Sequence, residues 1–111
     1  MVGRAQYLTV VMSPESLAVL ADIWDWNCKT YGPDHADEYI SFLRDVTDRL
    51  CTEYLTAKAI PSIPHLSFRT ITRRKRQHGH VVVFEVLNDR ILIAKYFHTS
   101  QDWQRKLADN S

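Results

Sequence analysis

Several residue types are scarce in this chain of 111 residues, which has three glycines, four prolines and two cysteines. So little glycine and proline excludes collagen-like and low-complexity chains. Hydrophobic residues make up 45% of the sequence, too many for a disordered protein. The two cysteines, Cys28 and Cys51, are too few for a disulfide scaffold or a cysteine-built zinc site. We expect both to be reduced and to lie in the core.

Long apolar runs are also missing. No stretch reaches the ~18 consecutive apolar residues of a membrane span, and the start of the chain lacks the apolar run of a signal peptide. A chain of this length is too short to divide into two stable domains. We therefore expect one soluble, cytoplasmic domain over residues 1–111.

Recognisable catalytic motifs are absent as well. The sequence has no Gly-rich phosphate loop, no nucleophile elbow and no carboxylate pair at a spacing suited to acid/base work. His78 and His80 could chelate a metal as a pair, but no further ligand has a recognisable spacing. The sequence therefore predicts no metal and no cofactor.

Charge is divided unevenly along the chain. Residues 1–53 carry nine acids and four bases, whereas residues 54–111 carry ten bases and four acids. This asymmetry favours an anionic or acidic partner for one face of the molecule.

The first half of the chain predicts a strand and a helical hairpin. Residues 6–12 are rich in β-branched and aromatic residues, as in a strand. Ser13 is placed to cap a helix over residues 14–31, and Asp34 to cap a second one that extends to about Tyr54. The joint between the helices is so short that they must be antiparallel. The predicted apolar stripe of the first helix is Leu17, Leu20, Ala21, Trp24, Cys28 and Tyr31.

The second half predicts a loop, three strands and a polar tail. Pro61 and Pro64 indicate a loop over residues 57–65. Residues 66–72, 81–87 and 90–97 then have the composition of strands, which we expect to form an antiparallel meander. The predicted fold class is α+β, with the helical hairpin packed on one face of a small, mainly antiparallel sheet and the other face partly open.

A basic segment between two predicted strands is the strongest local feature. It contains Arg73, Arg74, Lys75, Arg76, His78 and His80. Four consecutive cations suit binding of phosphates or of an acidic protein segment, although a solvated turn would have the same composition.

Two further groups are candidate binding residues. Arg69 and Lys95 lie in predicted strands and either form a basic stripe across the open sheet face or mark its solvent side. His98 is placed either as a general acid/base or as an anchor to Asp102, and Trp103 either as a stacking platform or as a lid on the core.

The sequence resembles the RelE/ParE-type toxins of bacterial toxin-antitoxin systems over nearly its whole length. Residues 13–15, Ser-Pro-Glu, and the following Ile23-Trp24-Asp25 are similar to the start of ParE, where the helical hairpin opens. Residues 68–72, residues 80–86 and the ending His98-Thr99-Ser100-Gln101-Asp102 resemble later ParE motifs in the same order.

The resemblance implies a toxin that is neutralised by a cognate antitoxin, which covers its basic face. ParE-like members of this superfamily are associated with poisoning of DNA gyrase, and the ending of this chain favours that branch. The implied target-binding residues are Arg69, Arg73, Arg74, Lys75, Arg76, His78, Lys95, His98, Asp102 and Trp103.

Two alternatives remain. RelE/YoeB-like members cleave mRNA in the ribosome, for which the candidate catalytic residues here are Arg69, His80 and His98. Such members often carry an arginine directly after the histidine of the third strand, where this chain has Val81, and its loss weakens that interpretation. The other alternative is a non-toxic basic binding module.

Overall fold

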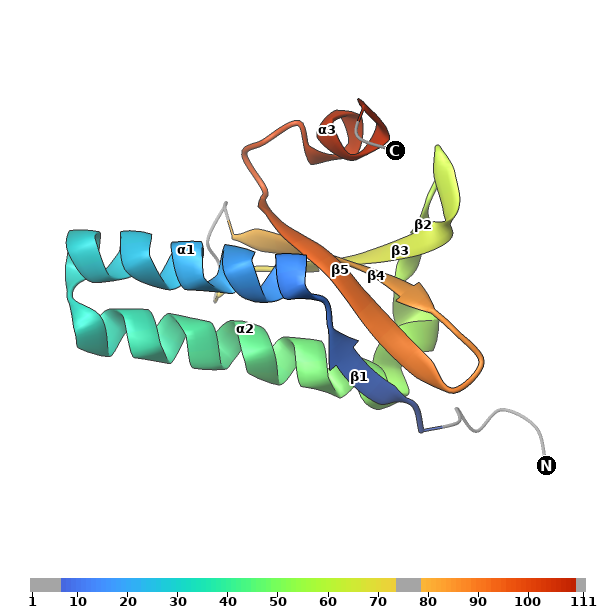
Figure 1. The fold of residues 1–111 in the computed structure, drawn as a ribbon, viewed down its shortest axis with the longest axis horizontal. Helices are drawn as coiled ribbons and strands as arrows, with labels where there is room; N and C mark the ends of the chain where they lie inside the picture. The colour runs from blue at the N-terminus through green and yellow to red at the C-terminus, as the bar shows by residue number, and fades with distance from the viewer. Residues whose placement is uncertain (1–6, 74–78, 110–111) are drawn as a thin grey trace.

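The computed structural model describes residues 7–73 and 79–109, which form a five-stranded sheet with a helical hairpin on one face (Figure 1). The strand order is β1-β5-β4-β3-β2; β1 is parallel to β5 and the other neighbours are antiparallel. This confirms the predicted α+β fold. The elements are β1 (Thr9–Met12), α1 (Pro14–Tyr31), α2 (Pro33–Glu53), the 3-10 turn η1 (Tyr54–Thr56), β2 (Lys58–Ile60), β3 (Ile63–Ile71), β4 (His80–Val86), β5 (Arg90–His98) and α3 (Trp103–Asp109).

Helix α1 has the predicted bounds, but the residues that it buries in the core are not the predicted apolar stripe. Ser13 caps the helix, since its Oγ accepts the Ser16 amide at 3.0 Å. The buried residues are Ser16, Leu20 and Asn27, whereas Leu17 and Tyr31 are exposed. Ser16 and Asn27 are tolerated inside because their side chains donate to the backbone carbonyls of Ser13 and Ile23, each at 2.8 Å.

Trp24 and the cysteines also differ from the prediction. Trp24 is half-buried, and its indole Nε1 donates to Asp37 Oδ1 across the hairpin at 2.8 Å. Cys28 and Cys51 are free, as predicted, but both are only partly buried.

Helix α2 follows the predicted apolar period, with Ala36, Leu43, Val46, Thr47 and Leu50 buried. Its start differs from the prediction, because Pro33 is the first helical residue and Asp34 lies in the first turn instead of capping it. Gly32 joins the helices at φ +99°, a conformation that favours glycine.

The first core lies between the hairpin and the sheet. It includes Leu20 and Leu43 from the helices and Phe84, Ile93 and Tyr96 from the strands. The Tyr96 hydroxyl is satisfied inside the core by Thr47 Oγ1 at 2.7 Å, and Thr47 in turn donates to the Leu43 carbonyl.

A second apolar cluster covers the opposite face of the sheet. Its buried members are Ile60, Ile63, Val81, Val83 and Phe97. The predicted loop at residues 57–65 is wrong, because this segment forms β2 and the start of β3. The predicted polar tail instead contains α3, which lies over this face (Figure 1) and contributes Trp103 and Leu107 to the cluster.

A β-bulge decides which face of the sheet Lys95 occupies. Val83 is opposite Lys95, but Phe84 is opposite Ile93, so Ala94 is an extra residue in β5. Ile91 and Ile93 therefore face the hairpin, whereas Phe97 faces the second cluster. The two-residue alternation of a regular strand, which would place Lys95 on the side of Ile91 and Ile93, is interrupted.

Candidate functional site

The acidic and basic halves of the chain pair with each other in the folded molecule. Among the described residues, three ion pairs join a base from the second half to an acid from the first: Arg69 with Glu53, Arg73 with Glu38, and Lys95 with Glu15. Part of the charge asymmetry is therefore satisfied within the molecule.

Arg69 is held against the end of α2. Its Nη1 lies 2.6 Å from Glu53 Oε1, and its Nη2 donates to Thr56 Oγ1 and to the Glu53 carbonyl. Its side chain is 20% exposed. Arg69 thus ties β3 to α2 and η1.

Lys95 likewise ties a strand to a helix, in this case β5 to the start of α1. Its Nζ lies 3.1 Å from Glu15 Oε1 in the first turn of α1 and 5.2 Å from the centre of the Phe97 ring. Arg69 is opposite Val82, a residue of the first core, whereas Lys95 is opposite Val83, a residue of the second. The two cations therefore lie on opposite faces and do not form the predicted stripe.

Part of the basic segment can be placed. Arg73 lies beside α2, with its Nη2 3.8 Å from Glu38 Oε2 and its guanidinium 5.9 Å from the centre of the Phe42 ring. The other predicted binding residues of this segment, Arg74, Lys75, Arg76 and His78, lie outside the described residues. The sequence prediction for them stands untested.

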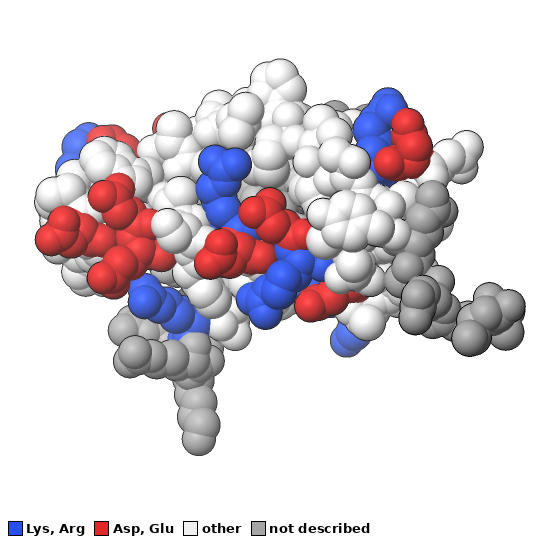
Figure 2. All heavy atoms as spheres, turned by 90° about the horizontal axis from the view of Figure 1, so that it is seen from below, with Lys and Arg blue, Asp and Glu red and all other residues white. Residues whose placement is uncertain are grey.

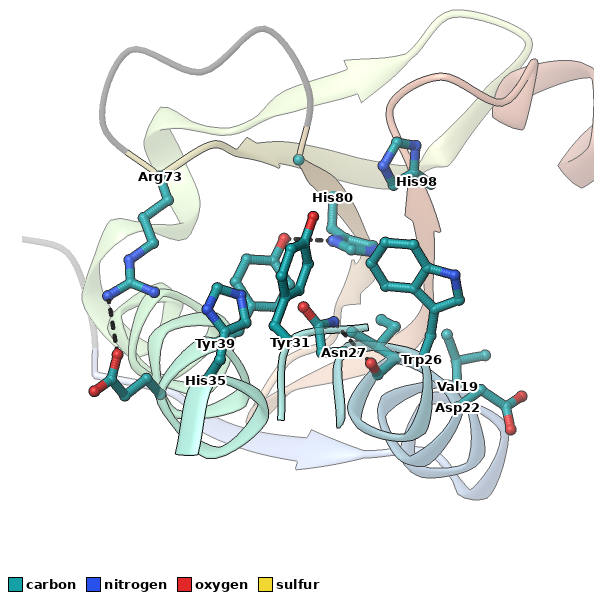
Figure 3. Close-up of a pocket in the computed structure, with 13 residues that line it drawn as sticks. Val19, Asp22, Trp26, Asn27, Tyr31, His35, Tyr39, Arg73, His80 and His98 are labelled. Carbon is teal, nitrogen blue, oxygen red and sulfur yellow. Dashed lines mark hydrogen bonds and ion pairs between the residues drawn. The ribbon is translucent and has the colours of Figure 1, made fainter. Parts of the chain in front are cut away.

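A cleft of about 980 Å³ lies between the hairpin tip and the ends of β4 and β5 (Figure 3). Val19 and Ile23 give it an apolar part, while Tyr39, His80 and His98 supply polar atoms. Its other lining residues are Asp22, Trp26, Asn27, Tyr31, His35, Glu38, Arg73 and Gly79.

His80 is the most perturbed group in the cleft. Tyr39 Oη lies 2.6 Å from His80 Nδ1. Burial, and to a smaller extent the nearby His98, lowers the pKa of His80 to about 4, so its imidazole is neutral at pH 7. Burial also raises the pKa of Tyr39 to about 12, although Arg73 opposes this shift. Tyr39 therefore donates its O–H to His80 Nδ1.

His98 lies directly opposite His80 in the β4–β5 pair. The two rings meet edge to face with centroids 5.2 Å apart. His98 Nδ1 lies 2.6 Å from Ser100 Oγ and accepts the Ser100 amide at 3.1 Å. Two imidazoles are thus brought together by strand pairing, with Tyr39 on the far side of His80.

Asp102 and Trp103 lie at the start of α3. The Asp102 carbonyl accepts the Lys106 amide in the first turn of α3. The Trp103 ring packs 5.0 Å from Phe68 and 6.1 Å from Phe97, so it covers the second cluster. Of the two roles predicted for Trp103, the structure has the lid on the core.

Sequence reasoning missed three ring-bearing residues of the cleft: Tyr31, His35 and Tyr39. Trp26, by contrast, lies outside the predicted apolar stripe, and the sequence predicts it to be an exposed aromatic available to a partner helix or a second copy; it is exposed and lines the cleft. Nothing in the spacing linked Tyr39 to His80, because they are 41 residues apart.

Within residues 7–73 and 79–109, no group of three or more His, Cys, Asp or Glu residues could hold a metal ion. Within the same residues, no helix combines the length and apolar character needed to cross a membrane.

Comparison with known proteins places this fold in a family. The sequence matches, over residues 10–103, the family described as "ParE toxin of type II toxin-antitoxin system, parDE". None of the curated protein sequences compared matches the chain. Among solved structures, the fold is similar to a chain of the chromosomal ParDE toxin-antitoxin system from P. aeruginosa, with a TM-score of 0.71, 18% identity, and coverage of 81% of this chain and 94% of that one. The chain therefore belongs to the ParE toxin family of type II toxin-antitoxin systems.

Proposed function

We propose that this ParE-family chain arrests bacterial growth by binding DNA gyrase, without chemistry by its own side chains, and that a cognate antitoxin neutralises it. Family membership supports the toxin role and implies the antitoxin partner. The choice between binding and catalysis rests on the state of the groups that an RNA endonuclease would need.

The observation that carries the proposal is that the candidate catalytic groups on β3 and β4 are not available for RNA cleavage: one is bound to other side chains, one position lacks a charge, and one imidazole is uncharged. Arg69 is bound to Glu53 and Thr56. Val81, which stands where many ribonuclease members have an arginine, is 1% exposed in the second core. His80 has a pKa of about 4, so at neutral pH it is not the imidazolium that a general acid needs. Phosphate cleavage would have to rely on other groups.

One arrangement favours the second candidate, a ribosome-dependent RNA endonuclease. His98 and Arg73 both line the cleft that contains Tyr39 and His80. A proton-exchanging group near a guanidinium can support phosphate chemistry. In that case, His98→Ala should abolish mRNA cleavage and leave ribosome binding intact.

A supercoiling assay with purified gyrase tests the leading proposal. The wild-type protein should inhibit supercoiling in proportion to its concentration. Replacement of residues 73–76 by serine should abolish inhibition and growth arrest without unfolding the domain. Replacement of Arg105 and Lys106 in α3 by serine is the matched control and should retain activity. No inhibition by the wild type would refute the gyrase proposal.

A further inference from the structure

We propose that β5 has an open strand edge at Tyr96, to which an extended segment of DNA gyrase adds as a further β-strand. The edge lies in a groove between α1 and α3. This inference rests on the proposed function, since it names a contact that gyrase makes. In strand addition, backbone hydrogen bonds give the affinity and the neighbouring side chains give the specificity.

The edge is open because β1 is shorter than β5. β1 pairs with Arg90–Ile93, whereas β5 continues to His98 (Figure 1). Ser13 ends the pairing, since its amide donates to the Ile93 carbonyl and its Oγ to the Ala94 carbonyl, each at 3.0 Å. The chain then enters α1. Among the described residues, no strand lies beside β5 on this side beyond Ala94.

Pairing with β4 directs the backbone of Tyr96 toward this open side. In an antiparallel pair, residues that bond to the neighbouring strand alternate with residues whose N–H and C=O point away from it. The Thr99 amide donates to the Gly79 carbonyl, so every second residue of β5 before Thr99 also bonds to β4. His98 and Tyr96 are the alternate residues. The His98 amide accordingly donates to Gln101 Oε1 at 2.9 Å, on the side away from β4.

A groove of about 420 Å³ lies over this part of β5. Its lining includes Val19 of α1, Lys106 of α3 and Tyr96 itself. The Tyr96 side chain is buried in the first core, where its hydroxyl bonds to Thr47, so Tyr96 lines the groove with its backbone. An extended segment has free N–H and C=O groups for that backbone, whereas a helix uses these groups internally. The groove is therefore suited to an extended segment.

The position of the edge connects it to the surface already proposed for gyrase. Ile71, His80 and His98 are paired with one another across β3, β4 and β5. Arg73 follows β3 at this end of the sheet, and Tyr96 is two residues before the end of β5. A gyrase segment on β5 and the contact proposed for Arg73 therefore lie at the same end of the sheet.

The outer face of α2 is a poorer surface for this partner. Its exposed residues include Arg44, Asp45, Asp48 and Arg49. Figure 2 shows acids and bases alternating along this side of the molecule, with further acids gathered at the hairpin tip. Such alternation is typical of a solvated helix face. The β5 edge instead offers backbone groups that a second strand can pair with.

Hydrogen exchange resolved to single residues tests the open edge. In the free chain, the Tyr96 amide should exchange at least about tenfold faster than the Phe97 amide, which is bonded to β4. Purified gyrase should slow the Tyr96 amide about tenfold or more and leave Phe97 unchanged. A Tyr96 amide as protected as Phe97 in the free chain would overturn the open edge.

A bulky side chain in the groove tests the partner. Lys106→Trp should fill the groove and weaken inhibition of gyrase supercoiling about tenfold. Arg105→Trp is the matched control, because Arg105 is exposed on α3 but does not line the groove; it should inhibit within about twofold of wild type.

The outcomes separate this site from the proposed function. If the wild type inhibits gyrase but the Tyr96 amide stays unprotected, or Lys106→Trp inhibits fully, the docking site is refuted and the gyrase target stands. Protection of Tyr96 by purified antitoxin and not by gyrase would also refute gyrase as the occupant. If the wild type does not inhibit gyrase at all, the proposed function itself fails.

Discussion

The Tyr39 hydroxyl, on α2, and His80 Nδ1, on β4, are joined by a 2.6 Å hydrogen bond. This bond connects the helical hairpin to the sheet beside the cleft and places a donor on Nδ1 of an imidazole that burial keeps neutral. His98 adds a second ring against the other side of His80. The cleft wall is therefore sensitive to protonation and to loss of either partner.

Acid should destabilise the fold through His80. Its pKa is about 4 in the folded chain and 6.5 ordinarily. Below pH 6.5 the unfolded chain therefore binds the proton first, and the free energy of unfolding falls as pH drops from 6.5 to 4. The expected loss from this residue is about 3 kcal/mol, measured by urea unfolding across the pH range.

The variant His80→Gln removes this titration and should flatten the pH dependence. His65→Gln is the matched control, since His65 is exposed, and it should retain the wild-type slope. If His80→Gln had the full wild-type slope, the buried neutral imidazole would be refuted as the cause.

Loss of the Tyr39 hydroxyl should weaken the α2–β4 connection. Tyr39→Phe leaves His80 Nδ1 without its donor in a largely buried site, which costs about 1–3 kcal/mol of unfolding free energy at pH 7. Tyr31→Phe changes an exposed ring and should cost less than about 0.5 kcal/mol. Equal stability of the two variants, measured by thermal or urea unfolding, would contradict the assigned bond.

Arg69 should prove to be a structural residue and not a target-binding one. Arg69→Gln removes the pair with Glu53 and should lower the unfolding free energy by about 1 kcal/mol, while supercoiling inhibition is retained. Arg90→Gln, which affects only the neighbouring Asp89 pair among the described contacts, should change stability little. Lost inhibition with unaltered stability in Arg69→Gln would return Arg69 to the binding site.

Gly79 should not tolerate a side chain. A Cβ at this position would lie 2.1 Å from the Ile71 carbonyl oxygen, and Gly79 also exchanges hydrogen bonds with Thr99 next to His80. Gly79→Ala should cost about 2–3 kcal/mol and disturb the His80 resonances in NMR spectra. Gly32→Ala, strained by its positive φ but free of close contacts, should cost about 1–2 kcal/mol and leave those resonances unshifted.

Local signals predicted the helical part of the fold well. Ser13 and Pro14 define the start of α1, and Gly32 and Pro33 separate the helices. The core face of α1 was predicted wrongly because the prediction followed the spacing of apolar residues alone. Two polar residues, Ser16 and Asn27, are buried on this face, since their side chains donate hydrogen bonds to backbone carbonyls of the preceding turn.

The sheet and the site depended on contacts that sequence spacing does not encode. Two prolines hid the start of β3, since Pro64 lies inside that strand. The bulge at Ala94 changed the face of Lys95. Arg69 and His80 were identified as candidates, but their partners Glu53 and Tyr39 come from distant segments. Long-range pairing therefore decided which charged residues remain available.

The central claim is that this ParE-family chain arrests growth by blocking DNA gyrase. Its most direct test in cells is to induce the chain in a bacterial host and to pulse-label DNA and protein synthesis separately over the next minutes. The account predicts an early fall in DNA synthesis, with translation failing later. An immediate fall in translation, or no change in either, would contradict it.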